Sequence, residues 1–343
     1  MKGGLKKIAF VVTSALLVTL ALKTWAAPLQ RAAHLYGADD VGPVAAAGKR
    51  APRDSNVSGA IGQLQGGTYR TLPFAARFRL VEGRGLLVNA WINETGPYTL
   101  AIDTGAGATI LSEGVAQRAN VRPLAGRSTT IGGLSGASYG TGREARLRAL
   151  SIGDKNNYLP SQSTVIITNA LPEGVDGVLD PTESYWPLGY TIDFPQGTIS
   201  AFDPRSTPLR TEGATPGGAV VGWVAGDRTR RPFVLLNNGR KALIDTGSGF
   251  GLALSEREAQ NLGAAPRARG RTSEVRDLGG GRVAAHRIEP LTVRIGPMAL
   301  RNVPTDLLYG AEQGAPILLG RDALYPFKLS FDPQNRLISI SPR

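Results

Sequence analysis

The chain contains the tripeptide Asp-Thr-Gly twice, and the two copies stand in matching surroundings. The first is Asp103-Thr104-Gly105 and the second is Asp245-Thr246-Gly247. Each copy follows an apolar run and precedes small residues and a serine. Carboxylates on matching loops of two matching halves can meet at a pseudo-two-fold axis, where they cannot both ionise and therefore share a proton. This feature restricts the chain to folds made of two similar halves.

The spacing of further landmarks indicates an internal repeat rather than two chance tripeptides. Asp245 follows Asp103 by 142 residues, and Ser255 follows Ser112 by 143. Three apolar landmarks recur in the same order at offsets of 143, 140 and 137 residues: Ile152-Gly153 and Ile295-Gly296, Val178-Leu179 and Leu318-Leu319, Ile192-Asp193-Phe194 and Leu329-Ser330-Phe331. One Asp-Thr-Gly is weak evidence, because Asp followed by Gly is common in turns. Two copies in register are strong evidence of duplication.

Two segments resemble the signatures of retropepsin-like and pepsin-like aspartic proteases, in the bacterial single-chain form with an N-terminal membrane-targeting segment. Residues 100–112, Leu-Ala-Ile-Asp-Thr-Gly-Ala-Gly-Ala-Thr-Ile-Leu-Ser, are similar to the retroviral-type active-site strand and loop. Residues 315–322, Ala-Pro-Ile-Leu-Leu-Gly-Arg-Asp, are similar to the second signature, in which hydrophobic residues and a Gly precede a short helix. The resemblance covers residues 74–342. It implies an all-β, two-lobed, pepsin-like fold, which is a duplicated retropepsin-type fold with pseudo-two-fold symmetry.

The first half departs from the second signature at one residue. Val178-Leu179 is followed by Asp180, at the place where the family usually has Gly. Because Gly tolerates dihedral angles and close approaches that Asp does not, the local backbone of the first half is expected to differ here. More narrowly, two lobes behind an N-terminal leader resemble the PerP-like periplasmic proteases of alphaproteobacteria.

The resemblance and the chemistry of paired carboxylates together predict a catalytic site. Asp103 and Asp245 hold a water between them; the ionised carboxylate removes its proton, and the protonated carboxyl polarises the scissile carbonyl. This reaction needs no metal, cofactor or covalent intermediate. The resemblance further implies that the hydroxyls of Thr104 and Thr246 lock the two loops together, and that two glycines let the backbone approach the carboxylates. These glycines are Gly105 and Gly247.

Residues 131–140, Ile-Gly-Gly-Leu-Ser-Gly-Ala-Ser-Tyr-Gly, are expected to form a hairpin flap over bound peptide, because glycines supply the mobility that such lids need. Gly136 aligns with Gly279 by the offset of the Ile-Gly landmarks, which is compatible with a second flap. Tyr139 is either a flap aromatic or an ordinary strand aromatic. The substrate-binding residues expected in the first flap are Ile131, Gly132, Gly133, Leu134 and Gly136.

The flap segment also offers an alternative chemistry. Residues 136–140, Gly-Ala-Ser-Tyr-Gly, match the nucleophile elbow of serine hydrolases, which needs a strand-to-helix turn and a partnered His. The two histidines are His34, in an expected linker, and His286, alone in the second half. Two isolated histidines are too few for a His-rich metal site and leave no obvious partner for a Ser-His-Asp triad. We therefore expect His286 to have no catalytic role. A Gly- and Ser-rich hairpin explains the pattern.

Composition narrows the remaining classes. A chain of 343 residues with 42% hydrophobic content is ample for two lobes with a core each. The chain has no cysteine, which excludes disulfides, thiolate nucleophiles and Cys-ligated zinc. The net charge of +12 makes nucleic-acid binding a competing hypothesis. However, the arginines are scattered through both halves, few aromatic residues lie between them, and no nucleic-acid-binding motif is present. We therefore expect no nucleic-acid partner, and solvated surface charge rather than a docking surface for anionic lipid or an acidic partner.

The N-terminal residues 1–27 place lysines before a 15-residue apolar run, Ile8 to Leu22, and a small-residue exit. This pattern predicts an export signal or a retained membrane anchor, since the run is short for a span of about 20 residues. Residues 28–70 lack an apolar period and are expected to be a flexible spacer. The predicted lobes are residues 71–205 and 218–343, joined by a linker at 206–217 that contains Pro208 and Pro216.

Within each lobe the pattern predicts short strands before Asp-Thr-Gly and a brief helix after the serine. The expected strands are 74–81, 86–92 and 98–102 in the first half, separated by turns at 82–83 and 94–97, and 219–224, 232–236 and 241–244 in the second. The expected helices are 113–119 and 256–262, where Ser255 and Glu258 resemble a capping box.

The sequence thus predicts an aspartic endopeptidase that acts as a single chain on extended polypeptide, in the periplasm or anchored in the inner membrane with its lobes in the periplasm. The expected partner is a polypeptide substrate, such as the envelope-exposed segment of a membrane protein. Two alternatives remain: a catalytically silent peptide-binding module of the same fold, and a serine hydrolase.

Overall fold

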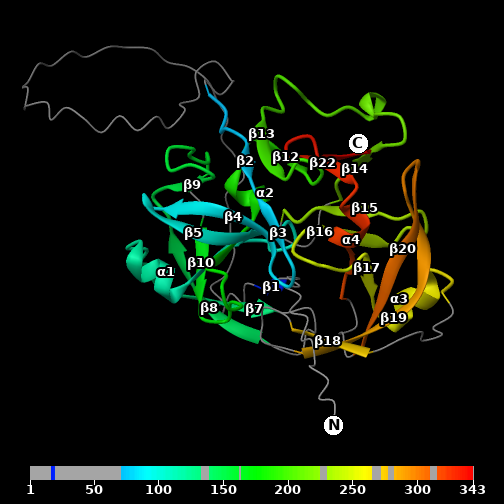
Figure 1. Ribbon diagram of the computed structural model, residues 1–343, viewed down its shortest axis with the longest axis horizontal. Helices are drawn as coiled ribbons and strands as arrows, with labels where there is room; N and C mark the ends of the chain where they lie inside the picture. The colour runs from blue at the N-terminus through cyan, green and yellow to red at the C-terminus, as the bar shows by residue number, and fades with distance from the viewer. Residues whose placement is uncertain are drawn as a thin grey trace, which may run out of the picture.

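The computed structural model of the protein describes residues 17–19, 71–132, 139–161, 164–224, 230–264, 272–276, 282–309 and 315–342. Two β-rich lobes lie side by side, left and right in Figure 1, and a third sheet at the top of that view joins them. The all-β, two-lobed fold that the resemblance to aspartic proteases implies is confirmed.

The first lobe is built on a ten-stranded sheet. In spatial order its strands are β1 (Leu17–Thr19), β7 (Pro123–Gly132), β8 (Tyr139–Arg146), β10 (Thr164–Thr168), β6 (Thr109–Ser112), β11 (Gly177–Leu179), β5 (Thr95–Ile102), β4 (Gly85–Ile92) and β3 (Arg79–Val81), with β9 (Leu150–Ile152) paired to β4. The central strands β11 and β5 are parallel, and both are buried where they pair. Three residues of the apolar leader, as β1, form the edge beside β7.

The turn between β4 and β5 is tighter than the sequence pattern indicated. The expected turn spanned residues 94–97, but β5 already begins at Thr95. The turn consists of Asn93 and Glu94, whose φ angles are 49° and 70°. Two consecutive positive φ angles suit a two-residue hairpin, because their twist matches that of the flanking strands.

The second lobe repeats the first in strand order. Its seven strands are β15 (Phe233–Leu235), β16 (Lys241–Asp245), β21 (Ile317–Gly320), β17 (Leu252–Leu254), β20 (Met298–Tyr309), β19 (Arg282–Ile295) and β18 (Thr272–Arg276). They correspond in sequence to β4, β5, β11, β6, β10, β8 and β7, and every neighbouring pair has the same parallel or antiparallel sense as its counterpart. The internal repeat is therefore also a structural repeat.

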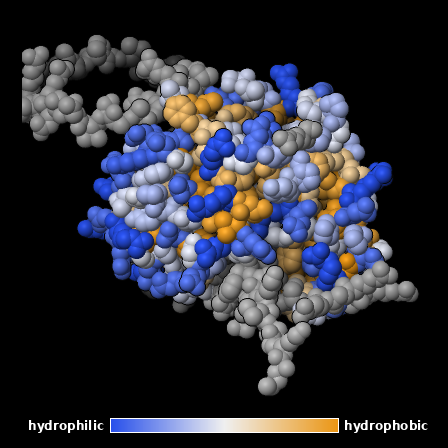
Figure 2. Space-filling model, viewed as in Figure 1, coloured by the Kyte–Doolittle hydropathy of each residue, from blue (hydrophilic) through white to orange (hydrophobic). Residues whose placement is uncertain are grey.

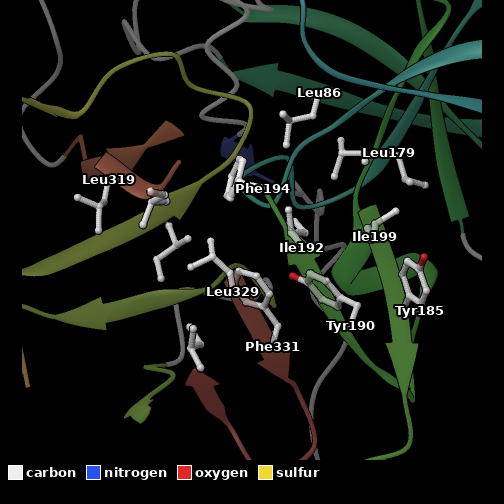
Figure 3. Packing of buried hydrophobic residues seen from close by; sticks show 14 of the residues in the cluster. Leu86, Leu179, Tyr185, Tyr190, Ile192, Phe194, Ile199, Leu319, Leu329 and Phe331 are labelled. Carbon is white, nitrogen blue, oxygen red and sulfur yellow. The ribbon is translucent and has the colours of Figure 1, made fainter. Parts of the chain in front are cut away.

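A six-stranded antiparallel sheet connects the lobes. Its strands are β14 (Ala219–Gly222), β23 (Leu337–Pro342), β22 (Phe327–Asp332), β12 (Gly189–Asp193), β13 (Thr198–Phe202) and β2 (Ala76–Arg77). The lobes meet at the β12–β22 pair, where Tyr190 lies opposite Phe331 and their rings stack at 4.7 Å between centroids. Figure 3 shows aliphatic and aromatic side chains of both lobes meeting over these strands. Part of the core is thus shared between the lobes.

Short helices follow equivalent strands in the two lobes. They are α1 (Glu113–Arg118), α2 (Pro181–Ser184), α3 (Glu256–Asn261) and α4 (Arg321–Leu324), with one 3-10 turn, η1 (Thr211–Gly213). Ser112 caps α1 by accepting from the Val115 N–H, and Ser255 caps α3 by accepting from the Glu258 N–H. The predicted helices after each serine are confirmed, and both end one residue earlier than expected.

Between the lobes, η1 lies in the segment predicted as a linker, after β13 and before β14. The spacer and most of the leader lie outside the described residues. Among the residues that the structure describes, no helix has the length and apolar character needed to cross a membrane. In the view of Figure 2, hydrophilic residues cover the outer sides of the lobes, and an apolar area lies in the middle of the face, where the lobes adjoin.

Candidate active site

The two Asp-Thr-Gly loops meet between the lobes. Asp103 directly follows β5, and its N–H donates to the Leu179 carbonyl (3.0 Å) of the neighbouring parallel strand β11. Asp245 ends β16 and pairs with Gly320 of the equivalent strand β21. Both carboxyls are fully buried. Each Asp-Thr-Gly loop is therefore anchored to a central strand pair of its own lobe, and the two carboxyls meet between the lobes.

Reciprocal hydrogen bonds between the two threonines join the loops. The Thr104 N–H donates to Thr246 Oγ1 and the Thr246 N–H donates to Thr104 Oγ1, both at 3.1 Å. Each hydroxyl then donates to a main-chain carbonyl of the opposite lobe, Thr104 to Ile244 (2.6 Å) and Thr246 to Ile102 (3.2 Å). All four groups are buried, so they have no water to replace these partners. The hydroxyls consequently determine the relative position of the two carboxyls.

The glycines after the threonines bring main-chain donors to the carboxyls. The Gly105 N–H donates to Asp103 Oδ1 (2.8 Å), and the Gly247 N–H donates to Asp245 Oδ1 (2.9 Å). A Cβ atom on Gly247 would overlap the carboxyl of Asp103, which lies directly against it. Only glycine at this position allows the Asp103 carboxyl to approach the second loop so closely.

The two carboxyls influence each other's ionisation. Burial, the negative charge of Asp103 and a side-chain hydrogen bond with Asp103 raise the pKa of Asp245 well above its ordinary range. The positive charge of Arg321 and the Ser248 N–H act in the opposite direction. Because like charges at close range disfavour double ionisation, each carboxyl disfavours the ionised form of the other. Such a pair supplies an acid and a base at the same point.

A family model described as gag-polyprotein putative aspartyl protease matches residues 88–175 and again residues 236–325. Each match contains one Asp-Thr-Gly, and together they cover more than half of the chain. The chain belongs to this aspartyl protease family. A search among curated proteins found no significant match. The two matches place one copy of the family's unit in each lobe, in agreement with the repeated strand order.

In this aspartyl protease the predicted flap residues are only partly described. Ile131 and Gly132 end β7, and Ile131 packs with Ala106, Ile110, Ile166 and Val178 in a small cluster that includes the loop after Asp103. Gly133, Leu134 and Gly136 lie outside the described residues, as does the tip of the second hairpin. Strands β18 and β19 nevertheless form an antiparallel pair in the second lobe, in the place that β7 and β8 occupy in the first.

Asp180 occupies ordinary backbone geometry despite replacing the usual glycine. Its φ and ψ are −83° and 107°, and its side chain caps α2 by accepting from the Thr182 N–H (2.8 Å). In the second lobe the equivalent residue is Gly320, where a Cβ atom would overlap the Phe250 carbonyl. The backbones of the two halves therefore differ here as expected: in the second lobe Gly320 packs closely against the Phe250 carbonyl, and in the first lobe the equivalent place has room for the Asp180 side chain. Burial raises the pKa of Asp180 well above its usual range, with Glu183 as the next cause.

Arg321 is a site residue that the sequence patterns did not single out. It is 7% exposed, and its Nη1 donates to the carbonyls of Thr246 (2.7 Å) and Gly247 (2.6 Å). Burial lowers the pKa of this guanidinium, while the charges of Asp245 and Asp103 raise it. The sequence did offer one clue to this residue. Arg321 directly follows the apolar strand Ile317–Gly320, and a charged side chain beside a buried strand needs a polar partner.

His286 has a structural environment on the second hairpin. Its Nδ1 lies 3.1 Å from Thr272 Oγ1, and its ring meets Tyr309 edge-on. Among the described residues, no group of three or more His, Cys, Asp or Glu side chains is arranged to hold a metal ion.

Proposed function

We propose that the protein is an endopeptidase in which Asp103 and Asp245 activate a water molecule for attack on a peptide bond. The observation that carries the proposal is the meeting of two buried carboxyls on symmetry-related loops that the Thr104 and Thr246 hydroxyls lock together. Membership of the aspartyl protease family supports proteolysis in general. The catalytic roles of Asp103 and Asp245 and the class of substrate are our proposal.

In the proposed reaction the ionised carboxylate removes a proton from the water as the water oxygen bonds to the scissile carbonyl carbon. The protonated carboxyl gives its proton to the carbonyl oxygen, so a neutral gem-diol forms. The first carboxyl then protonates the leaving nitrogen, the carbon–nitrogen bond breaks, and the diol returns a proton to the second carboxyl. Atoms and protons balance at every step, and the dyad returns to its starting state.

The proposed substrate is an extended polypeptide that lies between the lobes as an added strand. The hairpins β7–β8 and β18–β19 would cover it from the two sides, with Ile131 and Gly132 at the base of the first flap. Since Asp103 and Asp245 are fully buried, the cleft must open before a peptide reaches them. Closure over a bound peptide would exclude bulk water, which would strengthen the electrostatic interactions of the dyad with the peptide and with the attacking water.

Conservative replacement of the carboxyls tests the function. We expect Asp103→Asn and Asp245→Asn each to abolish cleavage of an unfolded polypeptide almost completely, and the double variant to be scarcely worse than either single variant, because the two residues act as one unit. The wild type should show a bell-shaped pH dependence of kcat/KM that belongs to the pair. Near-normal turnover by folded Asp245→Asn, or loss of activity in Ser138→Ala alone, would contradict the aspartic mechanism.

The same experiment separates a silent peptide-binding module from an enzyme. A silent module would bind a labelled extended peptide without cleaving it at any pH, and its binding would not respond to an inhibitor that bridges two carboxyls. The proposed enzyme should cleave the peptide, be inhibited by such a compound and resist a serine-reactive probe.

We further propose that the lobes act in the periplasm, either released or tethered to the inner membrane, on envelope-exposed polypeptide segments. The support is the leader pattern of lysines followed by the apolar run Ile8 to Leu22. Reporter fusions after Arg53 should be active only when the reporter works outside the cytoplasm, and sequencing the N-terminus of the mature protein will show whether the leader is cut. Reporter activity restricted to the cytoplasm would overturn this location.

A further inference from the structure

Equivalent rows of residues cross the central strands of the two lobes. In the first lobe the row consists of three apolar residues that lie directly opposite one another on β11, β6 and β10: Val178, Ile110 and Ile166. In the second lobe the row lies on β21, β17 and β20 and consists of Leu318, Ala253 and Asp306. Directly opposite residues of neighbouring strands share one face of a sheet. Asp306 therefore occupies the place that Ile166 has in the first lobe.

The row of the first lobe lies between the dyad loop and the proposed flap. Its three residues pack in one cluster with Ala106 and Ile131. Ala106 belongs to the loop after Asp103, and Ile131 lies at the base of the flap. The side chains of an extended peptide point alternately to opposite sides. A peptide held between the dyad and the flap would thus direct a side chain at this apolar cluster.

The row of the second lobe has the same relation to the second loop and hairpin. Ala253 and Leu318 pack with Phe250, in the loop after Asp245, and with Val283, in the second hairpin. Asp306 lies directly opposite Ala253 and is buried. The repeat therefore places a carboxylate where the first lobe has an aliphatic side chain.

Only one oxygen of the Asp306 carboxylate has a partner in the described part of the chain. Its Oδ1 accepts from Arg287 Nε at 2.9 Å, and Arg287 lies directly opposite on β19. Its Oδ2 is buried and has no hydrogen-bond partner among the described residues. A buried carboxylate oxygen without a donor costs free energy. A donor from a bound peptide would remove this cost.

Arg287 can supply the complementary donors. Its side chain is 48% exposed, and within the described ranges it donates through Nε alone. The N–H groups on Nη1 and Nη2 are therefore free to meet an acceptor of a bound peptide. In the first lobe Glu144 occupies the place of Arg287, but its partner is Arg127 on β7, whose side chain is 65% exposed. That ion pair does not include a member of the row.

The charges around Asp306 balance, which decides the kind of side chain that fits. Asp322, at the start of α4, lies close enough to sense the whole group: burial raises its pKa, Arg321 and Arg287 lower it, and Asp306 raises it. Two acids and two guanidiniums leave little net charge. A neutral side chain that carries both a donor and an acceptor therefore suits this place better than a cation or an anion.

We propose that the Asp306–Arg287 pair selects a substrate side chain that ends in a carboxamide, which is asparagine or glutamine, on the side of the scissile bond that the second lobe covers. The amide N–H donates to Asp306 Oδ2, and the amide carbonyl accepts from an Nη group of Arg287. The equivalent place of the first lobe, at Ile166, selects an aliphatic side chain. The inference rests on the proposed function and deepens it by naming two features of the substrate.

Peptides of matched shape test the selection with the full chain. Asparagine and leucine have nearly the same shape, as do glutamine and methionine, so each pair isolates the carboxamide. We expect one position of the substrate to favour the carboxamide by about tenfold or more in kcat/KM, because its loss leaves buried charged partners unpaired. An aliphatic preference is expected on the other side of the scissile bond. Equal cleavage within every matched pair would overturn the inference, as would a preference for lysine or arginine.

Variants of the pair show whether these two residues make the selection. Asp306→Leu gives the second row the apolar character of the first and should reverse the preference toward leucine and methionine. Asp306→Asn, which keeps the shape of the side chain, and Arg287→Met should each weaken the preference. The ratio compares two peptides with one enzyme, so a general loss of activity or stability does not change it. Arg301→Gln, at an exposed position of β20, is the control and should leave the ratio unchanged.

An unchanged ratio in both Asp306 variants would overturn the inference. Binding of the labelled peptide pairs to Asp245→Asn, measured by fluorescence anisotropy, separates this result from failure of the proposed function. If the wild type cleaves no peptide but Asp245→Asn still prefers the carboxamide, the proposed function is wrong and the selection stands. If the wild type cleaves both members of each pair equally and Asp245→Asn binds them equally, the selection alone is wrong.

Discussion

At the scale of single residues, the buried carboxyls oppose folding once they ionise. The pKa of Asp245 in the folded protein is raised, so the native state keeps its proton at pH values where the unfolded chain has released it. Stability contributed by this group is therefore present below its unfolded pKa, about 3.9, and is lost as the pH rises toward the folded pKa. Burying two carboxyls side by side thus costs electrostatic free energy, and the hydrogen bonds of the threonines and glycines in the two loops offset part of this cost.

Asp245→Asn should consequently stabilise the protein near neutral pH. The amide keeps the acceptor for the Gly247 N–H but cannot ionise. We expect a higher Tm than that of the wild type at pH 7, with the difference shrinking as the pH falls toward about 4, where both forms are neutral. Thermal denaturation across this pH range measures the effect. A lower Tm at pH 7 would contradict the argument, as would a difference that does not depend on pH.

The threonine hydroxyls should contribute stability as well as position. Thr104→Val removes the acceptor of the Thr246 N–H and the donor to the Ile244 carbonyl, and it leaves both of these groups buried without that partner. We expect a loss of about 1–3 kcal/mol for each unsatisfied group in urea denaturation. Thr95→Val, on an exposed position of β5, is the matched control and should change stability by less than about 0.5 kcal/mol. Equal effects would refute a special role for the hydroxyl.

At the scale of elements, the two lobes use one strand order with different close contacts. Gly320 ends β21 directly behind the loop that carries Asp245, and a Cβ atom there would overlap the Phe250 carbonyl. In the first lobe the same place accommodates Asp180, which instead caps α2. At this point behind the Asp-Thr-Gly loop, the second lobe therefore has no room for a side chain, whereas the first lobe has room for one.

Gly320→Ala should therefore destabilise the second lobe. Because the obstacle is a backbone carbonyl rather than a mobile side chain, the strand must shift, at a cost of about 1–3 kcal/mol. The matched control is Gly222→Ala in β14, where an added Cβ meets nothing within 4 Å. The control should be neutral or slightly stabilising. Chemical denaturation compares the two variants. An unchanged midpoint for Gly320→Ala would contradict this prediction, because it would show that β21 accommodates an added methyl group beside the Phe250 carbonyl.

At the scale of the whole molecule, the lobes are parts of one cooperative unit. Strands of both lobes form the six-stranded sheet, and the rings of Tyr190 and Phe331 stack across the boundary. The dyad, too, exists only when both loops are present. A separated lobe would expose half of the shared core and lose the opposite carboxyl, so independent folding of the lobes is not expected.

Phe331→Ala should lower the stability of both lobes together. Its side chain is fully buried at the boundary, and truncation of a buried Phe costs about 3–5 kcal/mol. Calorimetry should show a single transition at a lower Tm rather than two separate transitions. The control is Phe74→Ala, because Phe74 is 78% exposed and its loss should have little effect. Two transitions in the wild type, or unfolding of only the second lobe in the variant, would contradict a shared core.

Much of the architecture follows from the sequence by itself. The repeated tripeptide and the near-constant offsets of its landmarks determined two similar β-rich lobes, since a duplicated chain folds into duplicated structure. Serine caps predicted both helices because their hydrogen bonds are local. The placement of Asp103 and Asp245 on matching loops was predictable for the same reason, and the single turn that was misplaced, at Asn93 and Glu94, depends on two positive φ angles that no residue type required.

Only the tertiary structure decided what surrounds the two carboxyls. Arg321 follows Asp245 by 76 residues (321 − 245), and its guanidinium reaches the Thr246 and Gly247 carbonyls because β16 and β21 are parallel neighbours. The fit of Asp180 likewise depends on the space beside the loop after Asp103, which differs between the lobes by one close backbone contact. Charge and free space at a buried site arise from packing between segments distant in the chain. A local pattern determines which residues enter the site, and long-range packing determines which charge each of them meets.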